Sequence, residues 1–131
     1  MLRSLVLASL VAPAVLSAQK PWKDLGATAA GNHVYVDPRS IKRAGDQVSA
    51  AVRVVFKEPV QTPKSVWKSS RTLTTFDCTK KYVAAKENAY FSDAASTKLV
   101  ERKVNKQPGF GPVLGGSPGA VAIAYLCGGK R

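Results

Sequence analysis

The chain has 131 residues, with 20 Lys and Arg against 8 Asp and Glu. This length supports one domain of ordinary size and excludes two. The formal net charge of +12 favours contact with polyanions, anionic lipid head groups or acidic protein surfaces, and it also aids solubility, but it does not determine the fold.

Residues 1–18 have the features of a secretory signal peptide. Arg3 is followed by an uncharged stretch rich in Leu, Val and Ala, and small residues close the segment. This order predicts export to the periplasm, the cell surface or the extracellular space, with cleavage near Ala18. Pro13 interrupts the apolar run of about 20 residues that a membrane-spanning helix needs. The expected mature chain, a single domain over residues 19–131, has 19 Lys and Arg against 8 Asp and Glu, a net charge of +11.

The first half of the mature chain predicts two strands. Residues 19–31 form a mixed segment in which Trp22 is expected to anchor the N-terminus. Residues 32–36 are rich in β-forming side chains and end at Asp37-Pro38, so we expect a short strand and then a turn or short helical loop to Asp46. Residues 47–57 form the clearest strand, because apolar side chains alternate with polar ones. The apolar face contains Val48, Ala50, Val52, Val54 and Phe56.

The second half predicts three further strands. Residues 58–64 contain two prolines and are expected to form a loop. Residues 65–77 are expected to form the next strand. Its apolar residues change from one face of the strand to the other, which predicts a bulge or twist near Ser69-Ser70. Residues 82–91 and 98–105 are expected to be strands joined by the polar turn 92–97. The last of these strands is charged, as is typical of a sheet edge.

A short helix is predicted after the glycine- and proline-rich residues 107–119, which are not expected to form regular structure. Ser117 suits the N-cap, Pro118 the first helical position and Gly128 the C-terminal stop, with Lys130 and Arg131 near the negative end of the helix dipole. A helix of about ten residues is marginal alone in water. We therefore expect it to dock on the rest of the domain.

The chain has two cysteines, Cys78 and Cys127. An exported protein with an even number of cysteines most often oxidises them, and two allow a single pairing. Two alternatives are free buried thiols and metal ligation. The second alternative would need carboxylates, because the chain has one histidine.

The sequence contains little material for catalysis, and no cofactor or metal is expected. A small secreted nuclease could pair His33 with one of several glutamates and an arginine for acid–base chemistry, but no spacing brings these residues together. The sequence has neither a phosphate-binding loop nor a nucleophile elbow, and no dedicated nucleic-acid-binding motif occurs. The glutamates that could pair with His33 in such a nuclease are Glu58, Glu87 and Glu101.

Aromatic and basic residues alternate after the first cysteine and could stack sugars or bases between cations. The alternative is ordinary sheet packing with a rim of lysines. The candidate binding residues are Lys80, Lys81, Tyr82, Lys86 and Tyr90, with Phe91 beside them.

The order of features resembles the bacterial surface-adhesin protein E family. The resemblance spans roughly Trp22 to Cys127, and Phe110 stands where a tryptophan is expected. It implies an α+β fold, here with about five to six antiparallel strands and a C-terminal helix docked by a disulfide. It also implies export to the periplasm or cell surface, binding of extracellular-matrix and serum proteins, and pairing as homodimers. The matching stretches are Trp22, Tyr35–Ile41, Val48–Phe56, Trp67–Ser69, Phe76–Cys78, and Pro112-Val113 through Ser117 to Cys127.

Three functional hypotheses follow. The first is an exported, non-enzymatic binding domain whose basic face engages an acidic macromolecule, a matrix component or an anionic envelope surface. The second is a structural envelope accessory domain whose charge only keeps it soluble. The third is a small secreted hydrolase that acts on RNA.

Overall fold

The computed structural model describes residues 22–128. These residues form one antiparallel sheet and one helix, so the predicted α+β class is confirmed. The elements in chain order are β1 (Lys23–Ala27), β2 (His33–Val36), the 3-10 turn η1 (Pro38–Ser40), β3 (Lys42–Ala44), β4 (Gln47–Gln61), β5 (Val66–Asp77), β6 (Tyr82–Phe91), β7 (Leu99–Val104), β8 (Gly111–Pro112) and α1 (Pro118–Gly128).

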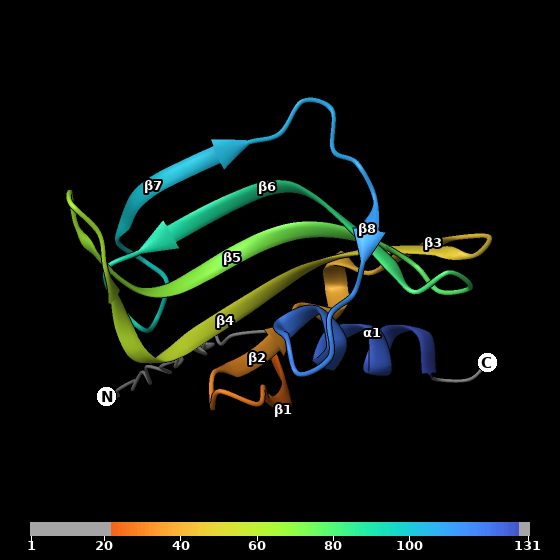
Figure 1. Ribbon diagram of the computed structural model, residues 1–131, viewed down its shortest axis with the longest axis horizontal. Helices are drawn as coiled ribbons and strands as arrows, with labels where there is room; N and C mark the ends of the chain where they lie inside the picture. Colours follow the sequence, from red (N-terminus) through yellow and green to blue (C-terminus); the bar gives the residue numbers. More distant parts are fainter. Residues whose placement is uncertain (1–21, 129–131) are drawn as a thin grey trace, which may run out of the picture.

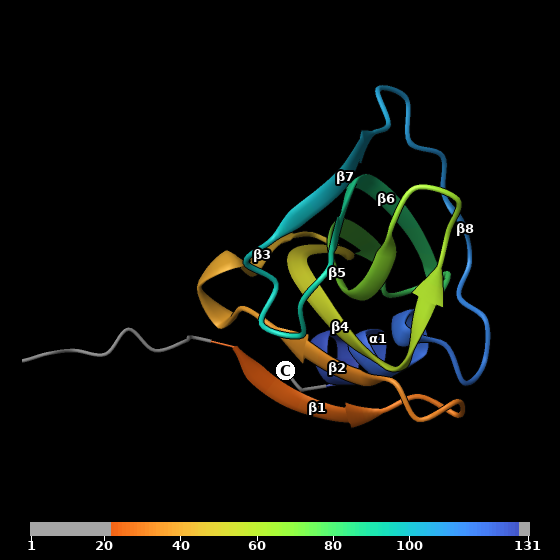
Figure 2. The same cartoon turned by 90° about the vertical axis from the view of Figure 1, so that its left-hand side faces the viewer.

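The strands follow the order β1-β2-β4-β5-β6-β7, with β3 paired to β4 and β8 paired to β6. The long strands β4, β5 and β6 bend strongly, and α1 lies against one face of the sheet (Figure 1). The end view shows that the sheet curls, so that β1 and β7 lie at opposite ends of the arc (Figure 2). We call the side that contacts α1 the helix face and the other side the outer face.

The core lies between the helix face and α1. The alternating apolar face of β4 supplies Val48, Ala50 and Val52, as the sequence predicts. These side chains pack with Phe76 of β5 and with three α1 residues spaced so that they share one side of the helix. The remaining buried members of the cluster are Val34, Val36, Ala122, Ile123 and Leu126.

The docking of α1 is confirmed in three details. Cys78 and Cys127 form a disulfide with their Cα atoms 5.5 Å apart, which links the end of β5 to the last turn of the helix. Ser117 caps the other end, because its Oγ accepts a hydrogen bond from the Ala120 N–H at 3.1 Å. Arg43 of the adjacent hairpin donates from Nη1 to the Leu126 carbonyl at 2.8 Å, which satisfies a free carbonyl at the C-terminal end.

The sheet has eight strands, so the expected count of five to six is wrong. Three short strands were missed, because none has the alternation that identifies a strand in sequence. β1 contains one large apolar residue, Leu25, and a left-handed glycine, Gly26, at a register shift. β3 is three exposed residues, and β8 is two residues within the glycine- and proline-rich segment expected to lack regular structure.

The predicted loop at 58–64 is also wrong in its first half, since β4 continues to Gln61. Pro59 is accommodated because the ladder with β5 is interrupted between Val55 and Val60, where the missing N–H removes no hydrogen bond. This interruption lies on β4, opposite Trp67–Ser69. An irregularity is therefore present near Ser69-Ser70, as predicted, but the extra residues belong to β4 and not to β5.

The expected signal peptide and the two basic residues expected beyond the helix, Lys130 and Arg131, lie outside the described residues. Within residues 22–128, no helix has both the length and the apolar character needed to cross a membrane.

Candidate functional site

A row of aligned residues crosses the outer face from strand to strand. Tyr35 of β2 is opposite Arg53 of β4, and Arg53 is opposite Arg71 of β5. The row continues through Ala89 of β6 to Arg102 of β7. Adjacent strands lie about 4.8 Å apart, so the register places Arg53 and Arg71 side by side. Like charges in this position repel each other.

Arg53 is held in place by its surroundings. Its guanidinium carbon lies 4.7 Å from the Tyr35 ring centroid and 5.4 Å from the Trp22 ring centroid. Its Nη1 donates to the Ala94 carbonyl at 2.7 Å and to Ser96 Oγ at 3.3 Å. Burial lowers the pKa of Arg53 from its ordinary value. These contacts give Arg53 a structural role. They also place the ring of Trp22, expected to anchor the mature N-terminus, beside Arg53 of β4.

The other two arginines of the row differ in their freedom to bind a partner. Arg102 donates from Nε to Glu87 Oε2 at 2.6 Å, and this hydrogen bond lowers the pKa of Glu87. Arg71 is exposed, its guanidinium carbon lies 5.5 Å from the Phe91 ring centroid, and it forms no ion pair with any described carboxylate. Arg71 is therefore the arginine of the row that remains free for an external anion.

A depression lies beside this row on the outer face, with a volume of about 650 Å³. Arg39, Lys42 and Lys86 supply three exposed cations, while Asp37 is its one carboxylate. We call this site the basic depression. Its other lining residues are Ser40, Ser49, Ala50, Ala51, Leu73 and Thr74.

Lys86 reaches the basic depression because of a β-bulge. Leu73 pairs with Glu87 and Thr74 pairs with Ala85, which leaves Lys86 as an extra residue in β6. A bulge of this kind redirects the side chain of the extra residue. The bulge explains how a lysine of β6 comes to line the same site as residues of η1 and β3.

Comparison with known proteins identifies the family to which the chain belongs. The family model described as surface-adhesin protein E matches residues 22–128. The chain belongs to the surface-adhesin protein E family. No match to a curated protein sequence was found.

Solved structures of Haemophilus influenzae protein E share the fold. Crystal form II is 13% identical, with a TM-score of 0.58 over 93% of this chain and 97% of that chain. A second structure is 14% identical, with a TM-score of 0.55 over 91% of both chains. A protein E structure from a non-typeable strain is also 14% identical, with a TM-score of 0.54 over 91% of this chain and 82% of that one. At these identities the likeness concerns the fold.

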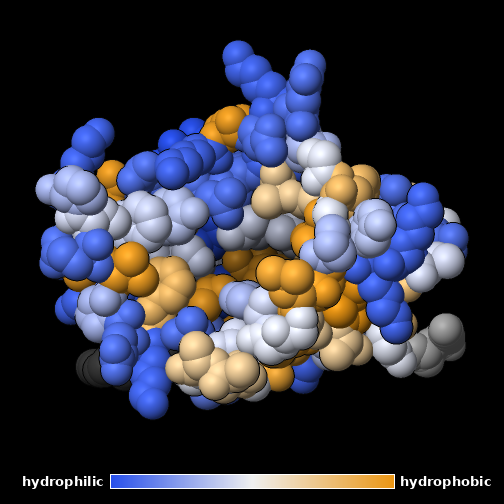
Figure 3. Space-filling view, in the orientation of Figure 1, coloured by the Kyte–Doolittle hydropathy of each residue, from blue (hydrophilic) through white to orange (hydrophobic). Residues whose placement is uncertain are grey.

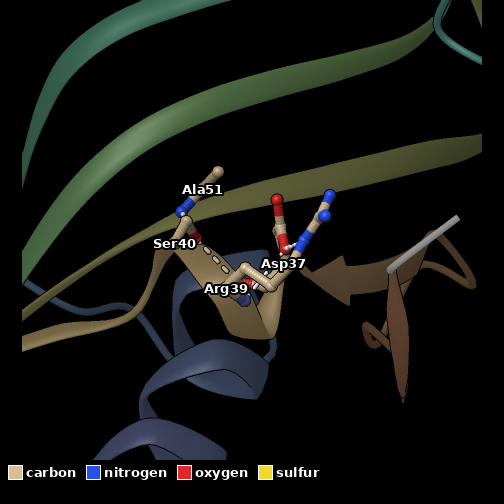
Figure 4. A network of polar contacts seen from close by, with 4 residues as sticks. All are labelled: Asp37, Arg39, Ser40 and Ala51. Atoms are coloured by element: carbon tan, nitrogen blue, oxygen red, sulfur yellow. Dashed lines mark hydrogen bonds and ion pairs between the residues drawn. The ribbon is translucent and has the colours of Figure 1, made fainter.

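The stretch Tyr35–Ile41, which carries part of the resemblance to the protein E family, has a structural role. β2 pairs with β4 from Val52 and β3 pairs with it up to Ser49, so η1 occupies the gap between them. The Asp37 N–H donates to the Ala51 carbonyl at 3.1 Å, and the Ala51 N–H donates to Ser40 Oγ at 2.8 Å (Figure 4). The Ser40 hydroxyl in turn donates to the Asp37 carbonyl at 2.6 Å. The Ser40 side chain therefore accepts the hydrogen bond of the Ala51 N–H in the gap between β2 and β3.

The same turn positions Arg39 at the rim of the basic depression. Asp37 Oδ1 accepts a hydrogen bond from the Arg39 N–H at 3.0 Å and lies 3.7 Å from Arg39 Nε (Figure 4). The Arg39 side chain is nevertheless 77% exposed. The ion pair with Asp37 is therefore weak, and the guanidinium can still reach an external anion.

Replacing Ser40 with alanine should lower the free energy of unfolding by about 2 kcal/mol, because the buried Ala51 N–H would lose its acceptor. Urea denaturation of Ser40→Ala would measure this loss. Ser40→Thr keeps the hydroxyl and serves as the control. A loss below about 0.5 kcal/mol in Ser40→Ala would contradict the bridging role.

The sequence-predicted binding residues do not form one cluster. Lys80 and Lys81 lie in the β5–β6 turn, and Tyr82 begins β6 at the same end of the hairpin. Tyr90 lies near the other end of β6, where its ring stacks on Trp67 at a centroid distance of 3.8 Å. Of the five, Lys86 alone lines the basic depression.

The arrangement needed by the hydrolase hypothesis is not assembled among the described residues. His33 Nε2 lies 3.2 Å from Asp24 Oδ1, and the His33 ring is 5.6 Å from that of Tyr35. No ion pair or hydrogen bond joins His33 to Glu58, Glu87 or Glu101, and residues 22–128 contain no group of three or more potential metal ligands.

Proposed function

We propose that this protein is an exported, non-enzymatic, adhesin-like domain that engages an acidic macromolecule through its outer face. The basic depression carries the proposal, because three exposed cations surround a concave site that has one carboxylate. Arg71 extends the cationic surface, two residues from Leu73 on the same face of β5.

The composition of the described domain supports an anionic partner. Residues 22–128 have 16 Lys and Arg against 8 Asp and Glu, a surplus of eight positive charges. Four of the eight carboxylates are already paired with a cationic or titratable side chain. The positively charged domain would attract an acidic polysaccharide, an acidic protein surface or an anionic envelope component. This attraction would weaken as the salt concentration rises.

Removing three cations from the outer face should weaken polyanion binding about tenfold, because each exposed contact contributes about 0.5 kcal/mol. The variant is Lys42→Gln, Lys86→Gln and Arg71→Gln, and the measurement is the affinity for heparin over a series of salt concentrations. The control removes the same charge from exposed positions elsewhere, with Lys64→Gln, Lys98→Gln and Lys106→Gln.

The two triple variants separate a binding face from a general charge effect. We expect the control to keep most of the affinity of the unmodified protein and to show a smaller change in salt dependence. Equal losses in both variants would contradict the proposal and favour the accessory domain whose charge only keeps it soluble. Circular dichroism would confirm that both variants are folded.

A further inference from the structure

A pocket on the helix face remains uncovered by α1. It has a volume of about 490 Å³, within the range of about 300–1,000 Å³ that is typical of small-ligand sites. Figure 3 shows hydrophobic surface gathered around a hollow on this side of the molecule, bordered by hydrophilic side chains. We call it the apolar pocket. Its apolar lining comprises Val52, Val54, Phe56, Phe76, Val83, Tyr90, Pro112, Val113 and Leu114.

Three of the five hydroxyl-bearing residues in the wall already donate within the protein, among them Ser117, whose Oγ donates to the Leu114 carbonyl at 2.6 Å. Thr72 Oγ1 donates to Asn88 Oδ1 at 2.9 Å, and Thr74 Oγ1 donates to the Ala50 carbonyl at 3.2 Å, so both hydroxyl protons are already used. The lining contains no carboxylate, amine or guanidinium. A sugar or nucleotide would bury several polar groups here without partners, which is costly.

The pocket walls come from distant parts of the chain. Strands β4, β5 and β6 form one side, while the segment from β8 to the first turn of α1 forms the other. Tyr90 lines the pocket and is stacked on Trp67. Leu114 lies in the second wall but is 69% exposed, which places an apolar side chain in contact with solvent.

We propose that the apolar pocket binds the acyl chain of an anionic lipid. Charge complementarity carries this choice: the pocket is uncharged, the exposed Lys81 adjoins its wall through a 3.1 Å hydrogen bond from the Val113 N–H to the Lys81 carbonyl, and residues 22–128 as a whole have a surplus of eight positive charges. A molecule with an aliphatic chain and an anionic head group matches both, because the chain fills the cavity and the head stays in the positive field outside. The site is separate from the basic depression, although Thr74 of β5 contributes to the lining of both.

Binding of dodecanoate below its micelle concentration would test the proposal. Calorimetry should show saturable binding of one chain per protein, and the Trp67 fluorescence should change because Trp67 stacks on a wall residue. Shorter fatty acids should bind more weakly, by about fourfold for each methylene removed, since each buried methylene contributes about 0.8 kcal/mol. Dodecanol should bind more weakly than dodecanoate, and the difference should shrink at high salt.

A pocket-filling variant locates the binding site. A Cβ added at Gly119 would lie 3.6 Å from Val113 Cγ1 and 3.9 Å from Phe76 Cε1, which are ordinary contacts. The Cβ of Gly119→Leu therefore fits, and the rest of the leucine side chain is expected to occupy part of the pocket and to weaken dodecanoate binding at least about tenfold, equivalent to losing about two methylenes. Ala124→Leu adds the same side chain at an exposed position of α1 and should bind as the unmodified protein does.

A second variant covers the case in which Gly119→Leu fails to fold. Leu114→Glu changes an exposed side chain and should also weaken dodecanoate binding about tenfold. Absence of saturable binding by the unmodified protein would overturn the proposal, as would unchanged binding in both folded variants. Binding of an apolar peptide at this pocket without any binding of dodecanoate would assign it to a protein partner instead.

Discussion

Replacing both Cys78 and Cys127 with serine should lower the free energy of unfolding by about 4 kcal/mol. The bond closes a loop with a sequence separation of 49 residues, and the chain-entropy model gives about this value for such a loop. Urea denaturation of Cys78→Ser/Cys127→Ser beside the oxidised protein would measure the change. The expected loss is a large share of the roughly 5–15 kcal/mol by which domains are stable.

Reductant supplies the matched control for this experiment. It should destabilise the unmodified protein by a similar amount and leave the double-serine variant unchanged. If reduction changed the free energy of unfolding by less than about 1 kcal/mol, apolar contacts alone would hold the helix, and the structural role of the bond would have to be abandoned.

Replacing Leu126 with alanine should cost about 3 kcal/mol, the second largest effect expected. Leu126 is 1% exposed and packs within the buried cluster between α1 and the helix face. Truncating a buried leucine removes transfer free energy and leaves a cavity, with losses of about 2–5 kcal/mol. Urea denaturation of Leu126→Ala under oxidising conditions would isolate this packing effect from that of the disulfide.

Leu114→Ala provides the comparison at an exposed site. Leu114 is 69% exposed, so the same truncation should cost less than about 0.5 kcal/mol. Similar losses in the two variants would show that the helix does not depend on the buried cluster for its docking.

The sequence predicted the parts of the fold that depend on local patterns. The alternation from Val48 to Phe56 identified the side of β4 that is buried. Ser117 and Pro118 identified the start of α1, because capping is decided within a few residues. The two cysteines left a single possible pairing, which the disulfide confirms.

The candidate site could not be predicted in the same way, because register and bulges position it. Arg53, Arg71 and Arg102 are far apart in sequence and are aligned by strand pairing. The bulge at Lys86 depends on how β6 pairs with β5, and the spacing of apolar residues within β6 gives no signal for it. Grouping residues by their nearness in sequence therefore joined Tyr90 to Lys80, although they lie toward opposite ends of β6.

Strands from the beginning of the domain and the helix from its end form the core together. The helix α1 contacts β1, β2 and β4, while β5, β6, β7 and β8 come between them in the chain. Many native contacts therefore join residues that are distant in sequence, and such a high contact order slows folding because long loops must close first. Little of the core can form until the helix has been synthesised. This delay would keep the domain incompletely folded while its strands are being synthesised.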